Sequence, residues 1–152
     1  MKKMVGGIFA ALLLVAFCAG VIRATNEDYN QPWRAPDDAK KVKNPVLLTS
    51  KGLMVASELY EQKCAVCHGP TGGGDGPAAQ TLTRKPADFT DAKRMSKVTD
   101  GELFWKVSTG HGDMPAWQAG LSDNERWLIV SYLRVLTTYG LYRYLGTPLP
   151  NR

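Results

Sequence analysis

The sequence predicts an all-α domain in which short helices are separated by long loops, and three observations support this class. Apolar residues recur at the spacing of one helix face in three stretches. Two of these stretches begin with a capping box, in which Thr or Ser is followed three residues later by Glu. The sequence shows no sustained alternation of apolar and polar residues and no Asn-Gly hairpin signal, so β-structure is not expected.

The three predicted helices begin near Ser50, Thr99 and Ser122. Their apolar faces consist, in chain order, of Ala56, Leu59, Tyr60 and Cys64, of Leu103, Phe104 and Val107, and of Leu128, Tyr132, Val135 and Leu136. Loops rich in Gly and Pro lie between the helices, at residues 69–77, 84–90 and 110–120. A domain with three to four short helices and such long loops buries little apolar surface, so we expect a further group to fill its centre.

Composition and charge exclude two broad classes of protein. With 44% hydrophobic and 22% charged residues, the chain is not wholly disordered. Nineteen Lys and Arg against fourteen Asp and Glu give a net charge of +5, but Lys2, Lys3 and Arg23 lie in residues 1–24, which contain no acid. The remaining surplus, sixteen bases against fourteen acids, is only +2. Nucleic-acid binding needs a clustered basic face and is therefore not expected.

Residues 1–24 predict a signal peptide or an N-terminal membrane anchor. Two lysines form a positively charged start, and Met4 to Ile22 then run without a charge. This run is longer than the ~7–15 apolar residues of a usual signal segment and close to the ~20 residues that span a bilayer. Cleavage after Gly20 or Ala24 and retention as an anchor therefore both stay open.

A third possibility for this segment is that Cys18 is a lipid-attachment cysteine. The bulky Phe17 before it favours the simpler interpretation, in which Cys18 is an ordinary apolar residue of the export segment. All three fates place the rest of the chain on the outer side of the cytoplasmic membrane. The sequence therefore predicts a periplasmic or otherwise extracytoplasmic protein.

Residues 25–49 are expected to form a flexible linker. They contain three prolines and scattered charges and show no sustained hydrophobic period. Trp33 stands out in this stretch and is a candidate for packing against the domain. The folded domain is expected over residues 50–146, followed by a C-terminal tail at 147–152.

Residues 64–68 read Cys-Ala-Val-Cys-His, the attachment signal for c-type haem. On a helix, residues i and i+3 share a face, so the thiols of Cys64 and Cys67 can both reach the vinyl groups of one porphyrin while His68 projects toward the iron. A zinc site would need a second ligand pair, but Cys18 is the only other cysteine. A thioredoxin-like pair would need a βαβ context, and a simple disulfide leaves His68 unexplained. We therefore expect one covalent haem c.

Five motifs occur in order along the domain: Tyr60-x-x-x-Cys64-x-x-Cys67-His68-Gly69, Gly72 to Ala79, Lys85-Pro86-Ala87-Asp88-Phe89, Gly112-Asp113-Met114-Pro115-Ala116-Trp117, and Trp127-x-x-x-x-Tyr132-Leu133-Arg134. In these motifs, residues 50–136 resemble a single-haem class I cytochrome c. The resemblance implies the class I cytochrome c fold, with three to four short helices wrapped around one covalently bound haem. Ala56 departs from the pattern, because many relatives have Gly there, so we expect a slightly wider crossing of the first and last helices.

Met114 matches the distal iron ligand of this family. It stands 46 residues after His68 in a loop containing Gly and Pro, and Pro115 would stiffen its approach to iron. The alternatives are a core methionine that fills a gap, and His111 as the ligand instead. Ligation by His68 and Met114 would fill both axial positions, which leaves one-electron exchange as the chemistry.

Further site residues are proposed from the resemblance and from side-chain chemistry. Pro77 is offered as the carbonyl partner of the second His68 ring nitrogen, with a simple turn proline as the alternative. Trp117 is the candidate indole donor to a haem propionate, with a core aromatic role as the alternative. Arg84 and Lys85 are candidates to pair with a propionate or are solvated loop charges.

The sequence thus predicts an electron carrier, not an enzyme, which exchanges electrons with redox partner proteins that it does not identify. One alternative is a fixed haem c subunit of a larger respiratory or dehydrogenase complex. Candidate docking residues for such a complex are Trp33, Tyr139, Leu141, Tyr142 and Tyr144. Another alternative, a haem enzyme or gas sensor, requires that Met114 can leave the iron.

Overall fold

The computed structural model describes residues 32–145, and the side chains of residues 32–140. Its helices are α2 (Asp37–Lys41), α3 (Ser50–Lys63), α4 (Ala65–His68), the 3-10 turn η1 (Ala79–Thr81), α5 (Ala92–Met95), α6 (Asp100–Thr109) and α7 (Asp123–Leu145). No strand occurs among these residues, although an isolated bridge joins His111 and Met114. The predicted all-α class is confirmed, but α7, with 23 residues, is longer than the short helices expected.

Several predictions concern residues outside the described part of the chain. These are the export segment (1–24), the tail (147–152) and the docking side chains of Leu141, Tyr142 and Tyr144. Trp33 belongs to a unit that ends at Arg34, separate from the compact unit that follows, so its packing against the domain stays a prediction. Within residues 32–145, no helix has the length and apolar composition that crossing a bilayer requires.

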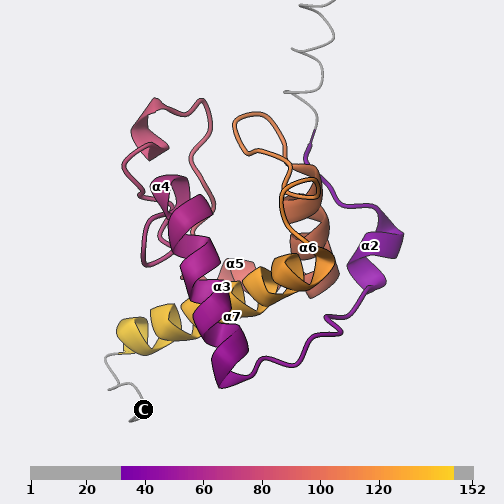
Figure 1. Ribbon diagram of the computed structural model, residues 1–152. Coiled ribbons are helices and arrows are strands. Elements are labelled where there is room, and N and C mark those ends of the chain that lie inside the picture. Colours follow the sequence, from indigo (N-terminus) through magenta and orange to yellow (C-terminus); the bar gives the residue numbers. More distant parts are fainter. Residues whose placement is uncertain (1–31, 146–152) are drawn as a thin grey trace, which may run out of the picture. The chain divides into compact units, whose positions relative to one another are not determined.

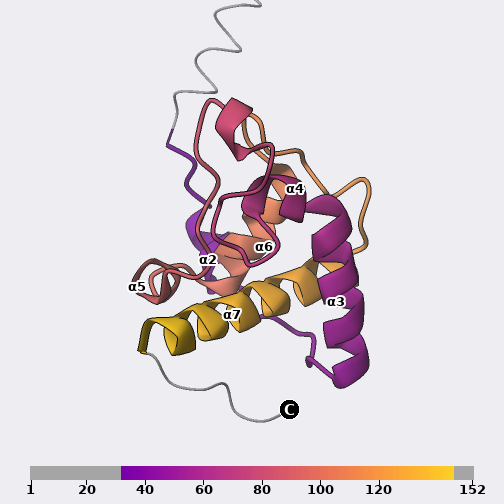
Figure 2. The same ribbon diagram turned by 90° about the vertical axis from the view of Figure 1, so that its left-hand side faces the viewer.

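α3 packs across α7 (Figures 1 and 2). Ala56 and Tyr60 are the buried residues of α3, and the Tyr60 ring packs on the Tyr132 ring of α7 with centroids 5.3 Å apart. At the start of α3, a Cβ on Gly52 would lie 3.0 Å from the Leu128 side chain, so the helix start also lies against α7. The apolar face predicted for α3 is therefore the face that meets α7.

Both capping boxes mark helix starts. The Glu102 N–H donates to Thr99 Oγ1 at 3.2 Å where α6 begins. Where α7 begins, the Ser122 N–H donates to Glu125 Oε2 at 2.8 Å, and the Glu125 N–H donates back to Ser122 Oγ at 3.3 Å. These bonds satisfy amide groups that have no partner inside the helix. Local sequence therefore sets where α6 and α7 begin.

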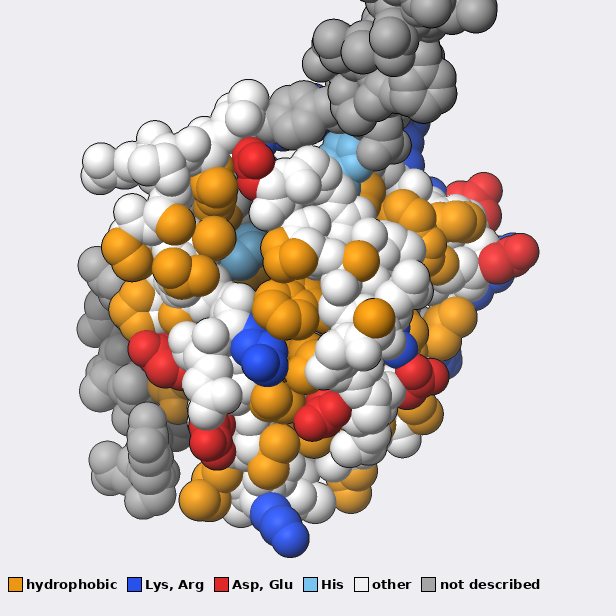
Figure 3. Space-filling model, turned by 45° about the horizontal axis from the view of Figure 1, so that its top comes forward, with side chains coloured by type: hydrophobic (Ala, Val, Ile, Leu, Met, Phe, Trp, Pro, Cys, Tyr) orange, Lys and Arg blue, Asp and Glu red, His pale blue; other side chains and the backbone are white. Residues whose placement is uncertain are grey.

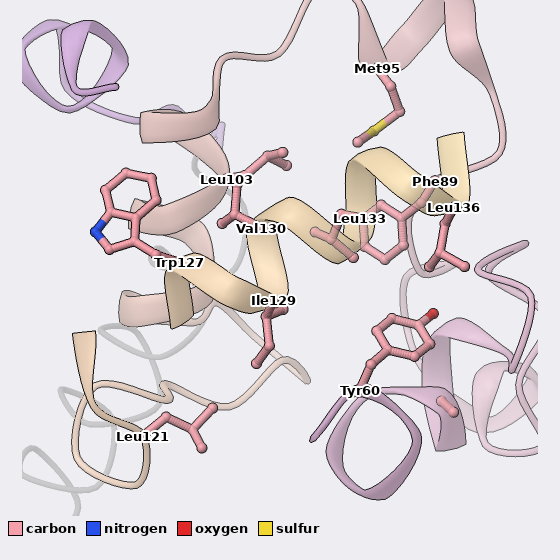
Figure 4. Packing of buried hydrophobic residues seen from close by; sticks show 11 residues of the cluster. Tyr60, Phe89, Met95, Leu103, Leu121, Trp127, Ile129, Val130, Leu133 and Leu136 are labelled. Carbon is pink, nitrogen blue, oxygen red and sulfur yellow. The ribbon is translucent and has the colours of Figure 1, made fainter. Parts of the chain in front are cut away.

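The hydrophobic core lies along α7 (Figure 4). Its α7 members are Trp127, Ile129, Val130, Leu133 and Leu136. Phe104 of α6 stacks on Trp127 with ring centroids 4.0 Å apart. Met95 of α5, which is 2% exposed, belongs to the same core. Each large apolar side chain that becomes buried stabilises the fold by roughly 1.5–3 kcal/mol, so α7 supplies much of the burial.

Part of the stretch predicted as a linker, from Ala35 to residue 49, belongs to the compact unit. Ala35 is 3% exposed, and α2 packs on α6. The helix backbones approach so closely that a Cβ on Gly101 of α6 would lie 2.0 Å from a carbonyl oxygen of α2. The Asn44 side chain then donates to a hydroxyl on α7 at 2.8 Å. Much of this packing uses backbone and polar groups together with isolated apolar residues such as Ala35 and Val46, so it leaves no hydrophobic period in the sequence.

Candidate functional site

Cys64 and Cys67 lie in one turn, where α3 gives way to α4. The Cys64 carbonyl oxygen accepts the N–H groups of Cys67 at 3.1 Å and of His68 at 2.9 Å. Both thiols are half-buried and are not joined in a disulfide. Burial raises the pKa of Cys64 to about 11, with Cys67 adding to the shift and Lys63 opposing it. The Cys64 thiol is therefore protonated at neutral pH, unlike the thiolate of a redox-active Cys-x-x-Cys pair.

The glycine-rich loop after His68 folds back against α4 and caps it. The Gly74 N–H donates to the His68 carbonyl oxygen at 2.8 Å, and the Gly76 N–H donates to that of Cys67 at 3.1 Å. Gly76 passes so close that a Cβ there would lie 2.5 Å from the carbonyl oxygen of Ala65. The loop amides thus satisfy carbonyl groups at the end of α4 and hold the turn that carries the two thiols and His68.

The His68 ring is held by two contacts with the segment that precedes α5. Its Nδ1–H donates to the carbonyl oxygen of Ala87 at 3.2 Å, so Ala87 takes the role predicted for Pro77. The ring also stacks on Phe89, with centroids 4.7 Å apart and planes at 25°. Burial lowers the pKa of His68, the Ala87 carbonyl opposes this, and Arg94 lowers it further. The imidazole is therefore neutral at pH 7, with Nδ1 protonated and the Nε2 lone pair available to a metal.

The path of the chain explains why Ala87 replaces Pro77. Next to Pro77, the Ala78 N–H donates to the Val66 carbonyl oxygen at 2.9 Å, which directs this part of the loop along the α4 backbone. Further on, the Phe89 N–H donates to the Gly72 carbonyl oxygen at 2.7 Å and brings its segment beside His68. Every residue has a carbonyl group, so no side-chain signal marked Ala87 in the sequence.

Met114 is presented by a tight reverse turn. The His111 N–H donates to the Met114 carbonyl oxygen at 2.9 Å, and the Met114 N–H donates to that of His111 at 3.0 Å. Gly112 has a φ of 56° and Asp113 a negative φ, as in a type II′ turn. Met114 is half-buried, and the methionine that fills a gap in the core is Met95 instead. The rival ligand His111 thus contributes its backbone to the turn that carries Met114.

The loop that carries this turn closes at its base on α6. The backbone N–H of Trp117 donates to the Val107 carbonyl oxygen at 3.1 Å. A Cβ on Gly110 would lie 2.5 Å from the Met114 carbonyl oxygen. The half-buried Trp117 ring lies 5.8 Å from the ammonium group of Lys63, the last residue of α3. Trp117 therefore stands beside the end of α3 that leads into the cysteine turn, and its bond to a propionate stays a prediction.

The face formed by α4 and the loops that follow α4 and α6 carries groups of hydrophobic side chains among polar and backbone surface (Figure 3). Hydrophobic side chains gather in its middle and toward one side, with few Lys and Arg side chains among them. Val66, between the two cysteines, is 50% exposed. Arg84 and Lys85 are also exposed, and their pairing with a propionate stays a prediction. An apolar, planar group with charged substituents suits such a surface.

These residues fit a haem c. Two thiols in one turn, a neutral histidine with an available Nε2 and a methionine thioether in a tight turn are the donors that such a group needs. Among the described residues, no three His, Cys, Asp or Glu side chains come together as ligands for a metal ion without haem.

Comparison with known proteins identifies the class. Residues 53–133 match the family described as cytochrome c oxidase, cbb3-type, subunit III, and because this is more than half of the chain, the protein belongs to that c-type cytochrome family. It is 28% identical over 89 residues to cytochrome c6 of Tetradesmus obliquus, a match that covers 55% of this chain and 90% of the relative. The single-haem class I resemblance and the expected electron-transfer activity are thereby confirmed.

A solved structure is similar in fold. A chain of the Kuenenia stuttgartiensis reducing HAO-like protein complex superposes with a TM-score of 0.52 at 31% identity. The match covers 62% of this chain and 49% of the other, so this chain spans about half the length of that relative.

Proposed function

We propose that this protein is a one-electron carrier with a single haem c, attached through Cys64 and Cys67 and ligated by His68 and Met114. The observation that carries the proposal is the state of His68. It is neutral, its Nδ1–H is held by the Ala87 carbonyl oxygen, and it directly follows the two free thiols in one helical turn.

Each side chain has a definite task in this proposal. The thiols of Cys64 and Cys67 form the thioether links, which prevent loss of the group. The bond from His68 to Ala87 fixes the ring and its tautomer, so that Nε2 can ligate. The turn around Met114 limits the positions of its thioether, which favours ferrous iron and raises the potential.

Electron transfer follows from this ligand set. A bound haem supplies a reversible ferric–ferrous couple. With His68 and Met114 as its ligands, a bound haem would have no coordination site left for oxygen or a substrate. The buried Phe89 ring stacks on the His68 imidazole and covers one side of it, and such an apolar neighbour of the ligand would also tune the potential. This arrangement suits a carrier better than a haem enzyme or a gas sensor.

The proposed location is the outer side of the cytoplasmic membrane. The two lysines and the uncharged run from Met4 to Ile22 support export. The haem domain would then work in the periplasm, released by cleavage or tethered by the N-terminal segment. Fractionation of cells that express the full chain, with blotting of the soluble periplasmic and membrane fractions, tests the location and distinguishes release from a tether.

Haem stoichiometry tests the function. Expression in cells that attach c-type haem should yield one haem per chain, measured as the pyridine haemochrome and retained after denaturing electrophoresis. At neutral pH the reduced protein should not bind carbon monoxide at concentrations that saturate Met114→Ala, because Met114 occupies the sixth position. Haem that separates on denaturation, or immediate binding of carbon monoxide, would contradict the proposal.

A second candidate is a fixed haem c subunit of a larger complex. The similarity to a chain of the Kuenenia stuttgartiensis reducing HAO-like protein complex favours it. Size-exclusion chromatography of the native protein in mild detergent separates the two. A carrier elutes at the mass of the single chain, whereas a subunit elutes together with its partners.

A further inference from the structure

One loop segment, residues 83–89, contacts both halves of the proposed site, and we call it the strap. At one end, its Ala87 carbonyl oxygen accepts the Nδ1–H of His68 at 3.2 Å, and its Phe89 ring stacks on the same imidazole. The backbone at this end is anchored, because the Phe89 N–H donates to the Gly72 carbonyl oxygen at 2.7 Å. The strap therefore has a defined position relative to His68.

The other end of the strap meets the turn that carries Met114. The Thr83 N–H donates to Asp113 Oδ2 at 3.0 Å, between residues that are 30 positions apart in the chain. Asp113 is the second central residue of the reverse turn and directly precedes Met114. A hydrogen bond thus connects the segment that orients His68 with the turn that presents Met114.

We propose that Asp113 is a positioning residue for Met114: by accepting the Thr83 N–H, it ties the turn to the strap, so that one segment positions both axial ligands. The inference rests on the proposed function, in which His68 and Met114 ligate the haem iron. It assigns to Asp113 a task that neither its charge nor its place in the sequence indicated.

The tie acts at the tip of the loop, where glycine residues have a wider choice of backbone conformations than other residues have. The base of the loop is held on α6, where the backbone N–H of Trp117 donates to the Val107 carbonyl oxygen and that of Gly110 donates to the Lys106 carbonyl oxygen. Between these bonds, Gly110 and Gly112 have φ values of 62° and 56°, a region that glycine enters without steric cost. A contact one residue before Met114 limits this freedom where it matters for the ligand.

The expected effect is modest and measurable. Both Asp113 and Thr83 are exposed, and a hydrogen bond of this kind changes an equilibrium by about three- to tenfold. Loss of the bond should raise, by that factor, the fraction of reduced protein in which Met114 is off the iron. Carbon monoxide competes with Met114 for the sixth position, so its affinity for the reduced protein should rise by the same factor.

The experiment uses the full, haem-loaded protein. Asp113→Ala removes the acceptor, Thr83→Pro removes the donor, and Asp113→Asn keeps an oxygen that can accept. Asp38→Ala is the matched control, because it removes an exposed carboxylate on α2. The measurements are the carbon monoxide affinity of each reduced protein and the hydrogen exchange of the Thr83 amide in the Asp113 variants.

We expect Asp113→Ala and Thr83→Pro each to raise the affinity about three- to tenfold, and the double variant to add nothing to the larger single effect. Asp113→Asn should stay near the parent and keep the Thr83 amide protected, and Asp38→Ala should change neither property. Unchanged affinity and amide exchange in Asp113→Ala, together with tight carbon monoxide binding by Met114→Ala, would overturn the inference and leave the proposed function intact. If Met114→Ala itself gained no binding, the axial assignment would fail, and the inference with it.

Discussion

Arg134 on α7 and Asp100 in the first turn of α6 form an ion pair, with Nε of the guanidinium 2.8 Å from Oδ1 of the carboxylate. The same guanidinium donates to the carbonyl oxygens of Met95 at 2.8 Å and of Val98 at 2.6 Å. Met95 is the last residue of α5, so one side chain fastens the connection between α5 and α6 to α7. The planar fork of an arginine suits this task, because it directs several N–H groups at fixed angles.

Arg134→Lys should therefore destabilise the haem-loaded protein by about 1–3 kcal/mol, because an ammonium group cannot reach all three acceptors. Unfolding in guanidinium chloride, followed by circular dichroism, measures this. The exposed Lys93 on α5 provides the control, since Lys93→Met should change the free energy of unfolding by less than about 0.5 kcal/mol. Equal stability of the two variants would show that the fastening contributes little.

Covalent attachment should depend on both cysteines of the turn. Replacing Cys64 and Cys67 together with Ala should abolish haem staining after denaturing electrophoresis and largely prevent folding, because the small core depends on the porphyrin. Cys18→Ala is the control and should stain like the parent, since Cys18 lies in the export segment. Staining that persists in the double variant would refute the attachment site.

Met114→Ala should leave haem attached and open the sixth coordination position. The midpoint potential should fall by on the order of 100 mV, because a ligand that favours ferrous iron is lost, and the reduced variant should bind carbon monoxide. His111→Ala should alter neither property, because His111 contributes its backbone to the turn. The reverse pattern, with iron opened by His111→Ala alone, would identify His111 as the ligand.

Stability should fall in mild acid. The pKa of His68 is lowered from 6.5 by burial, so below about pH 6.5 the unfolded chain binds a proton at His68 that the folded chain does not. The unfolded state then holds more protons, and the free energy of unfolding decreases as pH falls, by at most about 1.4 kcal/mol per pH unit for this group. Ligation of iron through Nε2 acts in the same direction, because it excludes the proton.

Unfolding midpoints in guanidinium chloride between about pH 7.5 and 5 measure this dependence. His111→Gln removes the other histidine and should preserve the slope. A stability that stays constant over this range would show that His68 is not held neutral in the folded protein.

The sequence by itself determined the features that depend on near neighbours in the chain. The capping boxes that start α6 and α7 span three residues, and the thiols of Cys64 and Cys67 share a turn because they are three residues apart. The same reasoning placed Met114 in a loop and His68 beside the thiols. Spacing and side-chain type carry this information, because local geometry repeats wherever a helix or a turn forms.

Only the tertiary structure decided which distant groups meet. Residues 35–49 have no hydrophobic period, yet they belong to the compact unit and pack in part through backbone and polar contacts. The partner of His68 is a carbonyl group 19 residues away, at Ala87, and Asp113 accepts an amide 30 residues away, at Thr83. Backbone carbonyl and amide groups are the same in every residue, so no residue type reveals which of them will be used, and the path of the folded chain selects them.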